Sequence, residues 1–409
     1  MAGTPLPYVL NRAAAALSLA VLVTGLWLLA DGLHALPRTD GWMVLGAVMV
    51  GASLFGRAPI LAMFPKAAPQ ADTPEGRSDA VVGAGGAHLH VERYGPADGW
   101  PIVLVQGFET DRTVWSPTVS ALAEQWQVLV WDQPGLGRSE RPYDEIYGLD
   151  RAAADLAAVL KLLEGRPALL VGWSTGAAAV LAYCRDHPQA LGAEVAGVAL
   201  LNPTTAPPAS GAMVRADMML APVIQVMNWA GYLNGALHLA ARTTALGQAP
   251  SREAADAAAR QTAETSPWVQ AKGALALRDA DLTGILARLT TPTLAVAGGY
   301  DVVARPAEVR ALAKALPDGE FVLLEEVGHA GPLERSDLYA KTLGAFADKV
   351  FGRLEQLARP RHADVLRRPS ALYEFRPEPR NFDDGFEPVP VKDEDERPFE
   401  GYGPTAGRA

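Results

Sequence analysis

Short apolar segments alternate with amphipathic segments along most of this 409-residue chain. A run of roughly five to seven apolar residues has the length of a β-strand, and a continuous run indicates burial on both faces. Amphipathic helical patterns, such as residues 152–164 and 306–316, lie between several of these runs. Strands that alternate with helices pair in parallel, so the sequence predicts an α/β fold with a mostly parallel sheet and helices on both faces. The predicted strands are residues 88–94, 102–106, 127–131, 168–172, 195–201, 293–297 and 321–325.

The alternation stops between the fifth and sixth of these strands. Residues 203–290 show helical patterns only, with an apolar opening part rich in Met and aromatic residues and a more polar part that follows. We therefore predict a helical insertion over an edge of the sheet. Two roles stay open for the Met and aromatic side chains, which are ordinary core packing and contact with a ligand.

The N-terminal part of the chain is unusually apolar. The segment Ala13–Ala30 contains no charged residue, and about 18 to 20 such residues span a bilayer core as a helix. A second apolar stretch, residues 41–56, continues past Arg57 to Phe64 and is long enough to span if Arg57 reaches the lipid headgroups. We predict that residues 1–64 form a membrane anchor of two transmembrane helices. A cleaved signal peptide and a buried pair of helices are the alternatives.

Basic residues flank the two apolar segments on their outer sides. Arg12 precedes the first, whereas Arg57, Lys66 and Arg77 lie at or after the end of the second. The positive-inside tendency therefore places both ends of the anchor, and the domain that follows, in the cytoplasm. Residues 65–79 are rich in Pro, Ala and charge, which is typical of a linker.

The composition excludes several classes of function. The formal net charge of −10 argues against nucleic-acid binding, which needs a basic surface to displace phosphate counterions. The single cysteine, Cys184, excludes an internal disulfide and a cysteine-rich metal cluster. The glycine-rich segment at Gly135 lacks the third glycine and the following helix of a nucleotide site, and ligand spacings for a metal are absent. We therefore predict no cofactor and no metal.

Residues 359–409 form a C-terminal tail rich in Pro and charge, without a sustained period. This composition is typical of a segment that is disordered or wraps over a surface. Aromatic residues recur along the tail, and a purely solvating tail does not need them. Two hypotheses stay open, docking on a protein partner or on the chain's own domain, and an inert tail.

Ser174 stands in the sequence Gly-Trp-Ser-Thr-Gly, directly after the predicted strand 168–172 and before a helical pattern. The motif alone is a weak signal, but a strand, a sharp turn and a helix are the setting that a nucleophile elbow requires. Side chains at Gly172 and Gly176 would clash with the neighbouring backbone in such a turn. We predict that Ser174 is a nucleophile.

A serine hydroxyl needs a base that removes its proton and a third group that orients the base. Of the seven histidines, only His329 follows a predicted strand in a loop, where ligands bind in parallel sheets. Asp301 lies between Ser174 and His329 in the chain and also follows a strand, whereas Asn202, at another strand end, cannot compensate imidazolium charge. We therefore predict His329 as the base and Asp301 as the acid.

Five motifs in order carry a resemblance to the α/β-hydrolase fold family, in the branch with a helical cap after the sixth strand. They are VLVQGFETDRTVW, VLVWDQPGLGRS, VGWSTG, TPTLAVAGGYD and VGHAGPLE. The resemblance implies a core of residues 80–202 and 291–358, a cap of residues 203–290, and the nucleophile, acid and base named above. It also implies an oxyanion hole made by the backbone N–H groups of Phe108 and Thr175. The family commonly has His where this chain has Gln106, which leaves the loop and substrate details open.

The combined features predict a membrane-anchored serine hydrolase, of the carboxylesterase or lipase type, that cleaves an ester through an acyl-enzyme intermediate. An apolar cap beside a membrane anchor favours a lipophilic acyl substrate. An acyltransferase, a carbon–carbon bond hydrolase, and a catalytically silent binding or assembly factor are the alternatives. The residues predicted to line the substrate pocket are Gln106, Trp173, Met218, Trp229 and Tyr232.

Overall fold

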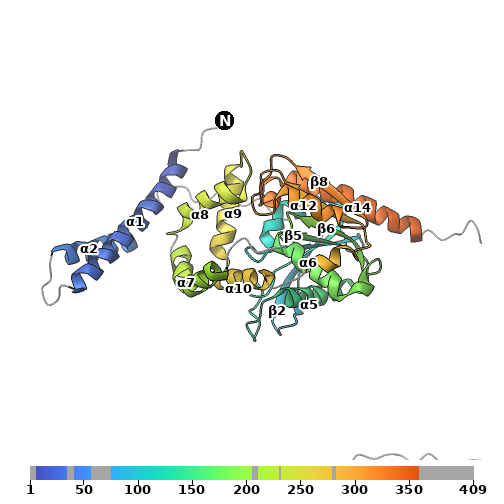
Figure 1. Ribbon diagram of the computed structural model, residues 1–409, viewed down its shortest axis with the longest axis horizontal. Helices are drawn as coiled ribbons and strands as arrows, with labels where there is room; N and C mark the ends of the chain where they lie inside the picture. The colour runs from blue at the N-terminus through green and yellow to red at the C-terminus, as the bar shows by residue number, and fades with distance from the viewer. Residues whose placement is uncertain are drawn as a thin grey trace, which may run out of the picture. The chain divides into compact units, whose positions relative to one another are not determined.

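A computed structural model describes residues 6–34, 41–56, 75–204, 211–229, 232–278 and 282–358 of the chain. Its centre is one eight-stranded sheet with strand order β1-β2-β4-β3-β5-β6-β7-β8 (Figure 1). Strand β2 is antiparallel to β1 and to β4, and all other neighbours are parallel. The strands are β1 Arg77–Val82, β2 His88–Tyr94, β3 Pro101–Val105, β4 Gln127–Trp131, β5 Ala168–Trp173, β6 Val195–Leu201, β7 Thr293–Gly298 and β8 Gly319–Leu324.

The predicted α/β fold is confirmed, and each of the seven predicted strands is present within two residues at either end. The missed strand is β1, whose exposed and partly buried residues include two charges in RSDAVV, so it has no apolar run. It is an edge strand that pairs on one side only. Because β1 begins at Arg77, the predicted linker of residues 65–79 extends too far.

Helices cover both faces of the sheet. The helices α5 Leu149–Leu160, α6 Thr175–Asp186 and α12 Pro306–Lys314 pack into one apolar core, and α4 Ser116–Leu122 and α14 Ser336–Ala358 pack into the other. The central strand β5 supplies both cores by alternation, because Leu170 contributes to the first and Leu169 and Val171 to the second. This two-sided burial is the reason why the strands read as unbroken apolar runs.

The described residues between β6 and β7 are helical or in turns. They comprise α7 Gly211–Trp229, α8 Asn234–Ala240, the π-helical turn η5 Ala241–Ala245, α9 Arg252–Glu264, α10 Pro267–Arg278 and α11 Thr283–Leu286. Helix α7 packs against α10, and α9 contributes Ala254, Ala255 and Ala258 to the core that α14 covers. We refer to α7–α10 as the cap.

Two N-terminal helices pack against each other, α1 Leu6–His34 and α2 Gly41–Gly51, which continues as the π-helical turn η1 Ala52–Gly56. The backbones approach closely at Gly25 and Gly46, where an added Cβ atom at either residue would lie 2.8–2.9 Å from the carbonyl oxygen of the other. Close approach of this kind needs glycine.

Among the described residues, one helix segment, Ala16–Leu33, is long and apolar enough to cross a bilayer by length and composition. The second apolar helix covers 41–56 only, which at 1.5 Å per residue is shorter than the ~30 Å of a hydrocarbon core. The prediction of two transmembrane helices is therefore not confirmed. Residues 57–64, which were expected to lengthen the second helix, and the tail 359–409 lie outside the described residues.

Candidate active site

Ser174 occupies the sharp turn between β5 and α6. Its backbone has φ +56° and ψ −125°, a conformation that is strained for a residue with a side chain. A Cβ atom at Gly172 would lie 2.5 Å from the Cα atom of Ala177, and one at Gly176 would lie 2.3 Å from the carbonyl oxygen of Val105. The two glycines therefore permit the tight strand-turn-helix packing that projects Ser174 from the sheet, as the sequence predicts.

Three predicted site residues meet at the carboxyl ends of β5, β7 and β8. The Ser174 Oγ atom lies 2.9 Å from Nε2 of His329, and Nδ1 of His329 lies 2.9 Å from Oδ2 of Asp301. The Asp301 side chain is fully buried, and the histidine side chain is 11% exposed. With Nδ1–H donating to the carboxylate, the unprotonated Nε2 is left to accept the serine proton.

Asp301 is held by more than the histidine. Its Oδ1 atom accepts hydrogen bonds from the backbone N–H groups of Val303 and Ala304, both at 2.8 Å. Its Oδ2 atom also accepts from Nδ2 of Asn202 at 2.9 Å. Each oxygen of the carboxylate therefore has two donors, which fixes the plane in which it meets the imidazole.

Asn202 is a functional residue that the sequence reasoning missed, because it was considered only as the acid and set aside. It is fully buried at the end of β6 with φ +44°, and its Oδ1 atom accepts the hydroxyl proton of Tyr339 at 2.5 Å. Burial raises the pKa of the Tyr339 phenol, so the phenol stays neutral and donates. A polar residue directly after an apolar strand was the available signal.

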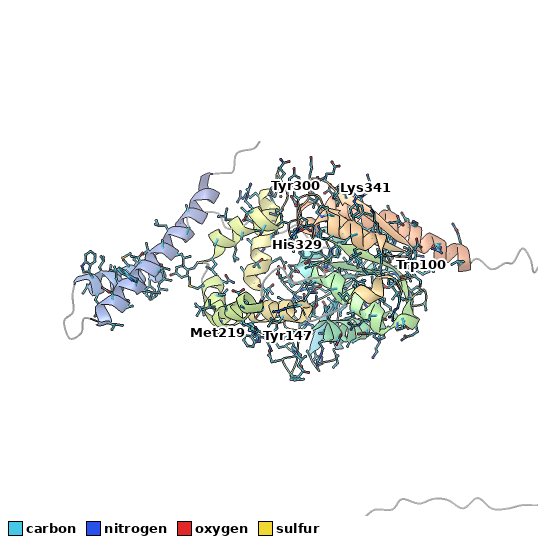
Figure 2. All side chains as sticks on the ribbon, viewed as in Figure 1. Trp100, Tyr147, Met219, Tyr300, His329 and Lys341 are labelled. Carbon is cyan, nitrogen blue, oxygen red and sulfur yellow. The ribbon has the colours of Figure 1, made fainter. Side chains whose placement is uncertain are left out.

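Trp173 was predicted to line the substrate pocket, but the structure places it behind the histidine loop. The side chain is 5% exposed, and its indole N–H donates to the carbonyl oxygen of His329 at 2.9 Å. Its ring also lies edge-on to Trp115, with centroids 6.4 Å apart. Trp173 therefore supports the backbone that carries the imidazole. Figure 2 labels His329 between the cap and the sheet.

The two predicted oxyanion residues contact each other. The backbone N–H of Phe108, in the loop after β3, donates to Oγ1 of Thr175 at 2.9 Å. The loop is close to the nucleophile, because a Cβ atom at Gly107 would lie 3.7 Å from Ser174 Oγ. The threonine hydroxyl thus accepts the hydrogen bond that the predicted oxyanion hole would offer to a substrate.

Gln106 is fully buried at the base of the same loop. Its backbone oxygen accepts a hydrogen bond from Nε2 of Gln133, whereas neither polar atom of its own side chain has a partner among the described residues. The substitution of Gln for the family's usual His therefore leaves hydrogen-bonding capacity unused at this position.

The other predicted pocket residues are dispersed. Met218 is half-buried on α7, and the side chain of Trp229 lies outside the described part of the chain. Tyr232 is buried, and its hydroxyl lies 3.0 Å from Oγ of Ser53 in the N-terminal helices. Tyr232 thus contacts the N-terminal helices, and its predicted role in a pocket stays a prediction.

A cleft with a volume of about 460 Å³ is lined by residues of α7, of α10 and of the loop after β4. It contains none of the predicted pocket residues. Helix α10 forms one wall and also contacts the oxyanion loop, since a Cβ atom at Gly273 would lie 2.6 Å from the Phe108 ring. The residues that line the cleft are Arg141, Glu145, Ala221, Pro222, Gln225, Ser266, Trp268 and Lys272.

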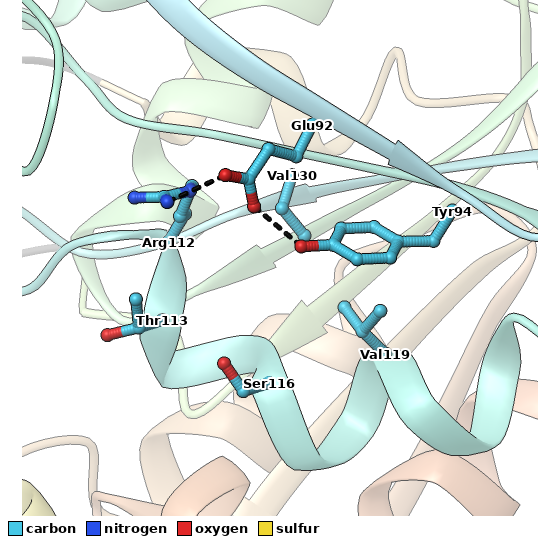
Figure 3. Close-up of a pocket in the computed structure, with 7 residues that line it drawn as sticks. All are labelled: Glu92, Tyr94, Arg112, Thr113, Ser116, Val119 and Val130. Atoms are coloured by element: carbon cyan, nitrogen blue, oxygen red, sulfur yellow. Dashed lines mark hydrogen bonds and ion pairs between the residues drawn. The ribbon is translucent and has the colours of Figure 1, made fainter. Parts of the chain in front are cut away.

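A buried charge network holds the segment that follows Phe108. Figure 3 shows Arg112 and Tyr94 on the two oxygens of Glu92, in a small cavity of about 120 Å³. The guanidinium of Arg112 lies 2.7 Å from Glu92 Oε1 and 2.9 Å from Asp132 Oδ2. Its backbone N–H donates to Asp132 Oδ1 at 2.8 Å.

The charges of this network are set by opposing effects. Burial raises the pKa of Glu92, but hydrogen bonds with Arg112, Tyr94 and His90 outweigh it and lower the pKa to about 2. Burial likewise raises the pKa of Asp132, against hydrogen bonds from the backbone N–H groups of Arg138 and Arg112. The ionised network therefore depends on Arg112.

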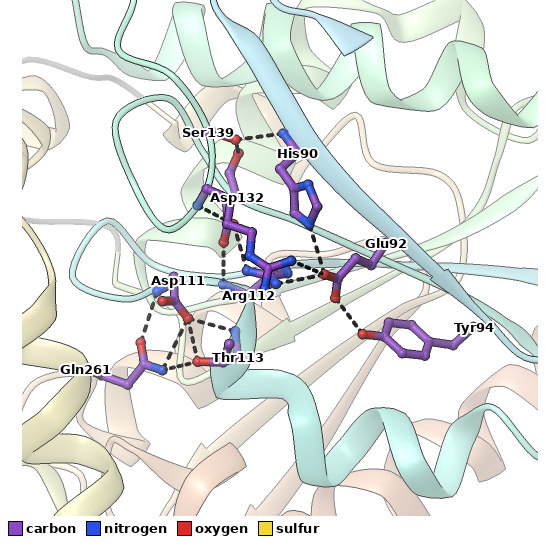
Figure 4. Close-up of polar contacts among 10 residues, drawn as sticks. His90, Glu92, Tyr94, Asp111, Arg112, Thr113, Asp132, Ser139 and Gln261 are labelled. Atoms are coloured by element: carbon purple, nitrogen blue, oxygen red, sulfur yellow. Dashed lines mark hydrogen bonds and ion pairs between the residues drawn. The ribbon is translucent and has the colours of Figure 1, made fainter. Parts of the chain in front are cut away.

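The cap is attached to the same segment. On α9, Gln261 accepts from the backbone N–H of Asp111 at 3.0 Å and donates to Thr113 Oγ1 at 2.6 Å (Figure 4). Cap position and oxyanion loop are thereby linked through three consecutive residues. Across the described residues, His, Cys, Asp and Glu side chains form no group of three or more that could hold a metal ion.

Comparison with known proteins identifies a family that shares this arrangement of the sheet, the turn at Ser174 and the loops after the strands. The chain belongs to the α/β hydrolase fold family, whose family model matches residues 101–336. One relative is RutD of Variovorax paradoxus, whose assigned activity is carbamate hydrolysis. It is 29% identical over 266 residues, which cover 64% of this chain and 97% of the relative. Hydrolase activity is thus supported by both the family and the relative.

Solved structures share the fold at lower identity. An esterase from Thermogutta terrifontis is 24% identical, covers 67% of this chain and 99% of its own, and has a TM-score of 0.56. The enol-lactonase of Burkholderia xenovorans LB400 is 23% identical, covers 66% of this chain and 99% of its own, and has a TM-score of 0.54.

Proposed function

We propose that this chain is a serine hydrolase that cleaves esters through an acyl-enzyme intermediate on Ser174. The observation that carries the proposal is the continuous hydrogen-bonded series from Ser174 Oγ through His329 to Asp301, with both contacts at 2.9 Å. The names of the similar proteins, an esterase and an enol-lactonase among them, support acyl transfer to water as the reaction class.

In the proposed reaction, Nε2 of His329 takes the proton of Ser174 as the oxygen attacks the ester carbonyl carbon. The backbone N–H groups of Phe108 and Thr175 stabilise the tetrahedral oxyanion. The imidazolium, held by Asp301, then gives its proton to the departing alkoxide. Water then attacks the acyl carbon while His329 takes a proton from the water. The imidazolium returns this proton to the departing Ser174 oxygen, which frees the carboxylic acid and restores the serine hydroxyl.

A fluorophosphonate probe tests the activated serine directly. We expect the detergent-solubilised full chain to become covalently labelled, and Ser174→Ala to lose the label entirely because the attacking oxygen is gone. Ser120→Ala, at a serine on α4 whose hydroxyl donates to its own helix backbone, is the control and should label like the wild type. A folded wild type that stays unlabelled would favour the silent binding or assembly factor.

We further infer a lipophilic acyl substrate, which the long apolar segment Ala16–Leu33 supports because it fits a bilayer. Membrane anchorage, with the hydrolase domain in the cytoplasm, is part of this proposal. We expect kcat/KM for p-nitrophenyl esters to rise with acyl length from acetate to decanoate, by about tenfold or more, since each buried methylene contributes ~0.8 kcal/mol. Faster turnover of acetate than of decanoate would contradict a lipophilic substrate.

The same chemistry also serves acyl transfer to an acceptor other than water and carbon–carbon bond hydrolysis. A carbamate should be tested beside the p-nitrophenyl esters, because the relative RutD is named as a carbamate hydrolase. Product analysis separates these reactions. Both hydrolyses place one oxygen of labelled water in the released acid, whereas transfer to another acceptor does not. An alcohol is the second product of ester hydrolysis, whereas cleavage of a carbon–carbon bond releases no alcohol from the bond that breaks.

A further inference from the structure

One side of the cap helix α7 is apolar and exposed. Met219, Leu220, Val223 and Val226 are between 54% and 84% exposed, and we call them the α7 face. Their spacing places them on one side of the helix, because residues three, four and seven positions apart share a side. On the opposite side, Val214 and Ala221 are buried. Helix α7 therefore has two apolar sides. One is buried, and the other, the α7 face, is exposed.

Exposed apolar stripes of this kind mark interaction surfaces. The α7 face carries no charged residue, and the charge nearest to it on the same side is Arg215, one turn before Met219 and exposed. On α8, Leu239 is also 63% exposed. In Figure 2, Met219 lies at the outer boundary of the cap.

The chain itself indicates what covers this surface. Tyr232, three residues after α7, contacts Ser53 at 3.0 Å, and Ser53 contacts Ser18 at 2.9 Å between their hydroxyl oxygens. Ser18 and Ser53 lie at the end of the helix pair from which the chain continues to β1, whereas the glycine contact lies farther along α1. Tyrosine is enriched at the interface between a bilayer and water.

The N-terminal helices have an exposed surface of the same kind. Leu17, Trp27 and Leu33 on α1 are 59–67% exposed, and a bilayer is the solvent that makes such a surface favourable. The hydroxyl contacts join the beginning of this apolar segment to Tyr232, which follows α7 by three residues.

We propose that the α7 face docks on the bilayer that holds α1, with its apolar side chains inserted at the boundary between headgroups and acyl chains. This inference rests on the membrane anchorage of the proposed function, and it adds a route for the substrate. The cleft between α7 and α10 opens beside the docked helix, and its far wall contacts Phe108 of the oxyanion loop. Arg141 lines the cleft and suits the anionic surface of phospholipid headgroups, whereas Lys272 in the same lining lies 3.6 Å from the carboxylate of Glu145.

Depth-dependent quenching tests the docking. The single native cysteine, Cys184, is fully buried, so a cysteine introduced on the surface can be labelled selectively with the fluorophore NBD. The full chain carrying Val223→Cys is labelled and reconstituted in phosphatidylcholine vesicles with or without doxyl-labelled phosphatidylcholine. We expect doxyl lipid to reduce the fluorescence at position 223 by about half or more, and aqueous iodide to have little effect.

Two matched positions calibrate the measurement. Asp217→Cys is on α7 but off the apolar side, and we expect its label to be quenched by iodide and not by doxyl lipid. Trp27→Cys, on α1, reports membrane insertion of the N-terminal segment. If the label at position 223 behaves like that at 217, the docking is wrong, whether or not position 27 is in lipid. If position 223 is shielded from iodide and also unquenched by doxyl lipid, a protein surface covers it, and the docking is equally wrong.

A kinetic comparison separates this inference from the proposed function. We expect Val223→Asp to lower kcat/KM for a long-chain ester carried in vesicles by about tenfold, and to leave hydrolysis of a short soluble ester unchanged. Val82→Asp, at a valine of nearly equal exposure at the end of β1, should change neither. Equal loss in Val223→Asp and Val82→Asp would contradict docking. Unaltered fluorophosphonate labelling of Ser174 in all variants keeps the hydrolase proposal intact under either result.

Discussion

Asp301→Asn is expected to lower the rate constant for fluorophosphonate labelling of Ser174, and kcat for any ester that the chain hydrolyses, by about 10⁴-fold. The fold is expected to persist, because asparagine has the shape of aspartate. The loss arises from the hydrogen-bond directions around the carboxylate. The substitution therefore tests whether Asp301 orients the imidazole of His329, and not whether the site needs a side chain of this size.

The contacts determine which way the new amide points. The Oδ1 position accepts from Val303 and Ala304, so the asparagine oxygen stays there and the NH₂ group takes the Oδ2 position. That group then faces two nitrogen atoms, Nδ1 of His329 and Nδ2 of Asn202. The imidazole can pair with it only as the tautomer that carries its proton on Nε2, and this tautomer cannot accept the proton of Ser174.

Rate constants for labelling are measured on wild type, Asp301→Asn and the control Asp318→Asn. Asp318 directly precedes the amino end of β8, whereas His329 follows its carboxyl end, and the Asp318 side chain is 47% exposed in an ion pair with Arg353. We expect Asp318→Asn to label at the wild-type rate. Labelling of Asp301→Asn within tenfold of the wild type would show that Asp301 does not orient the base.

Arg112→Met is expected to lower the free energy of unfolding by about 3–5 kcal/mol, because it leaves the buried carboxylates of Glu92 and Asp132 without their shared cation. Methionine replaces the stem of the side chain, so the loss reports the charge and the hydrogen bonds. Thermal unfolding of the detergent-solubilised chain, followed by tryptophan fluorescence, should show a Tm lower by roughly 10 °C. A shift below ~2 °C would contradict the role of the network.

Arg138→Met is the matched control for this change. Arg138 also pairs with Glu92, at 3.6 Å, but its side chain is 66% exposed, and exposed ion pairs contribute at most ~1 kcal/mol. We therefore expect its Tm to stay close to that of the wild type. The comparison separates a buried cation from an exposed one on the same carboxylate.

The dependence of the free energy of unfolding on pH, below about pH 4.5, provides a second measurement on these two variants. Because the pKa of Glu92 is about 2 in the folded chain and 4.5 when unperturbed, the unfolded state binds more protons between these values. The stability that Glu92 contributes is thus present above about pH 4.5 and is lost as the pH falls toward 2. In Arg112→Met the pKa is no longer lowered by the guanidinium, so this part of the acid dependence should become flatter. Arg138→Met should keep the wild-type slope.

Much of the fold follows from local patterns in the sequence. Strands β3 to β7 are buried along their whole length, so their apolar runs are visible without knowledge of the neighbours. Strand β1 was missed because an edge strand can keep charged residues such as Arg77 and Asp79. The second N-terminal helix is described for residues 41–56, and its predicted continuation to Phe64 lies outside the described residues.

The candidate triad could be named from the sequence because each member follows a strand, and the carboxyl ends of parallel strands meet at one edge. The pocket could not. Trp173 and Tyr232 are aromatic residues near the expected site, yet the indole donates to the backbone of His329 and the phenol contacts Ser53. The direction of a side chain depends on partners that are remote in the chain, and local composition carries no record of them.

The sequence by itself determined the α/β class, the order of the strands along the chain and the identity of Ser174, Asp301 and His329 as candidates, because buried strands and glycine-bounded turns are local features. The tertiary structure alone decided three contacts. Asn202, which accepts from Tyr339, donates to Asp301; Thr175 accepts from the backbone N–H of Phe108; and Gln261 joins the cap to Asp111, in the segment that follows Phe108. These contacts join residues between 67 and 150 positions apart. Only packing of the whole chain brings such distant groups within hydrogen-bonding distance, and the chemistry proposed for this site depends on them.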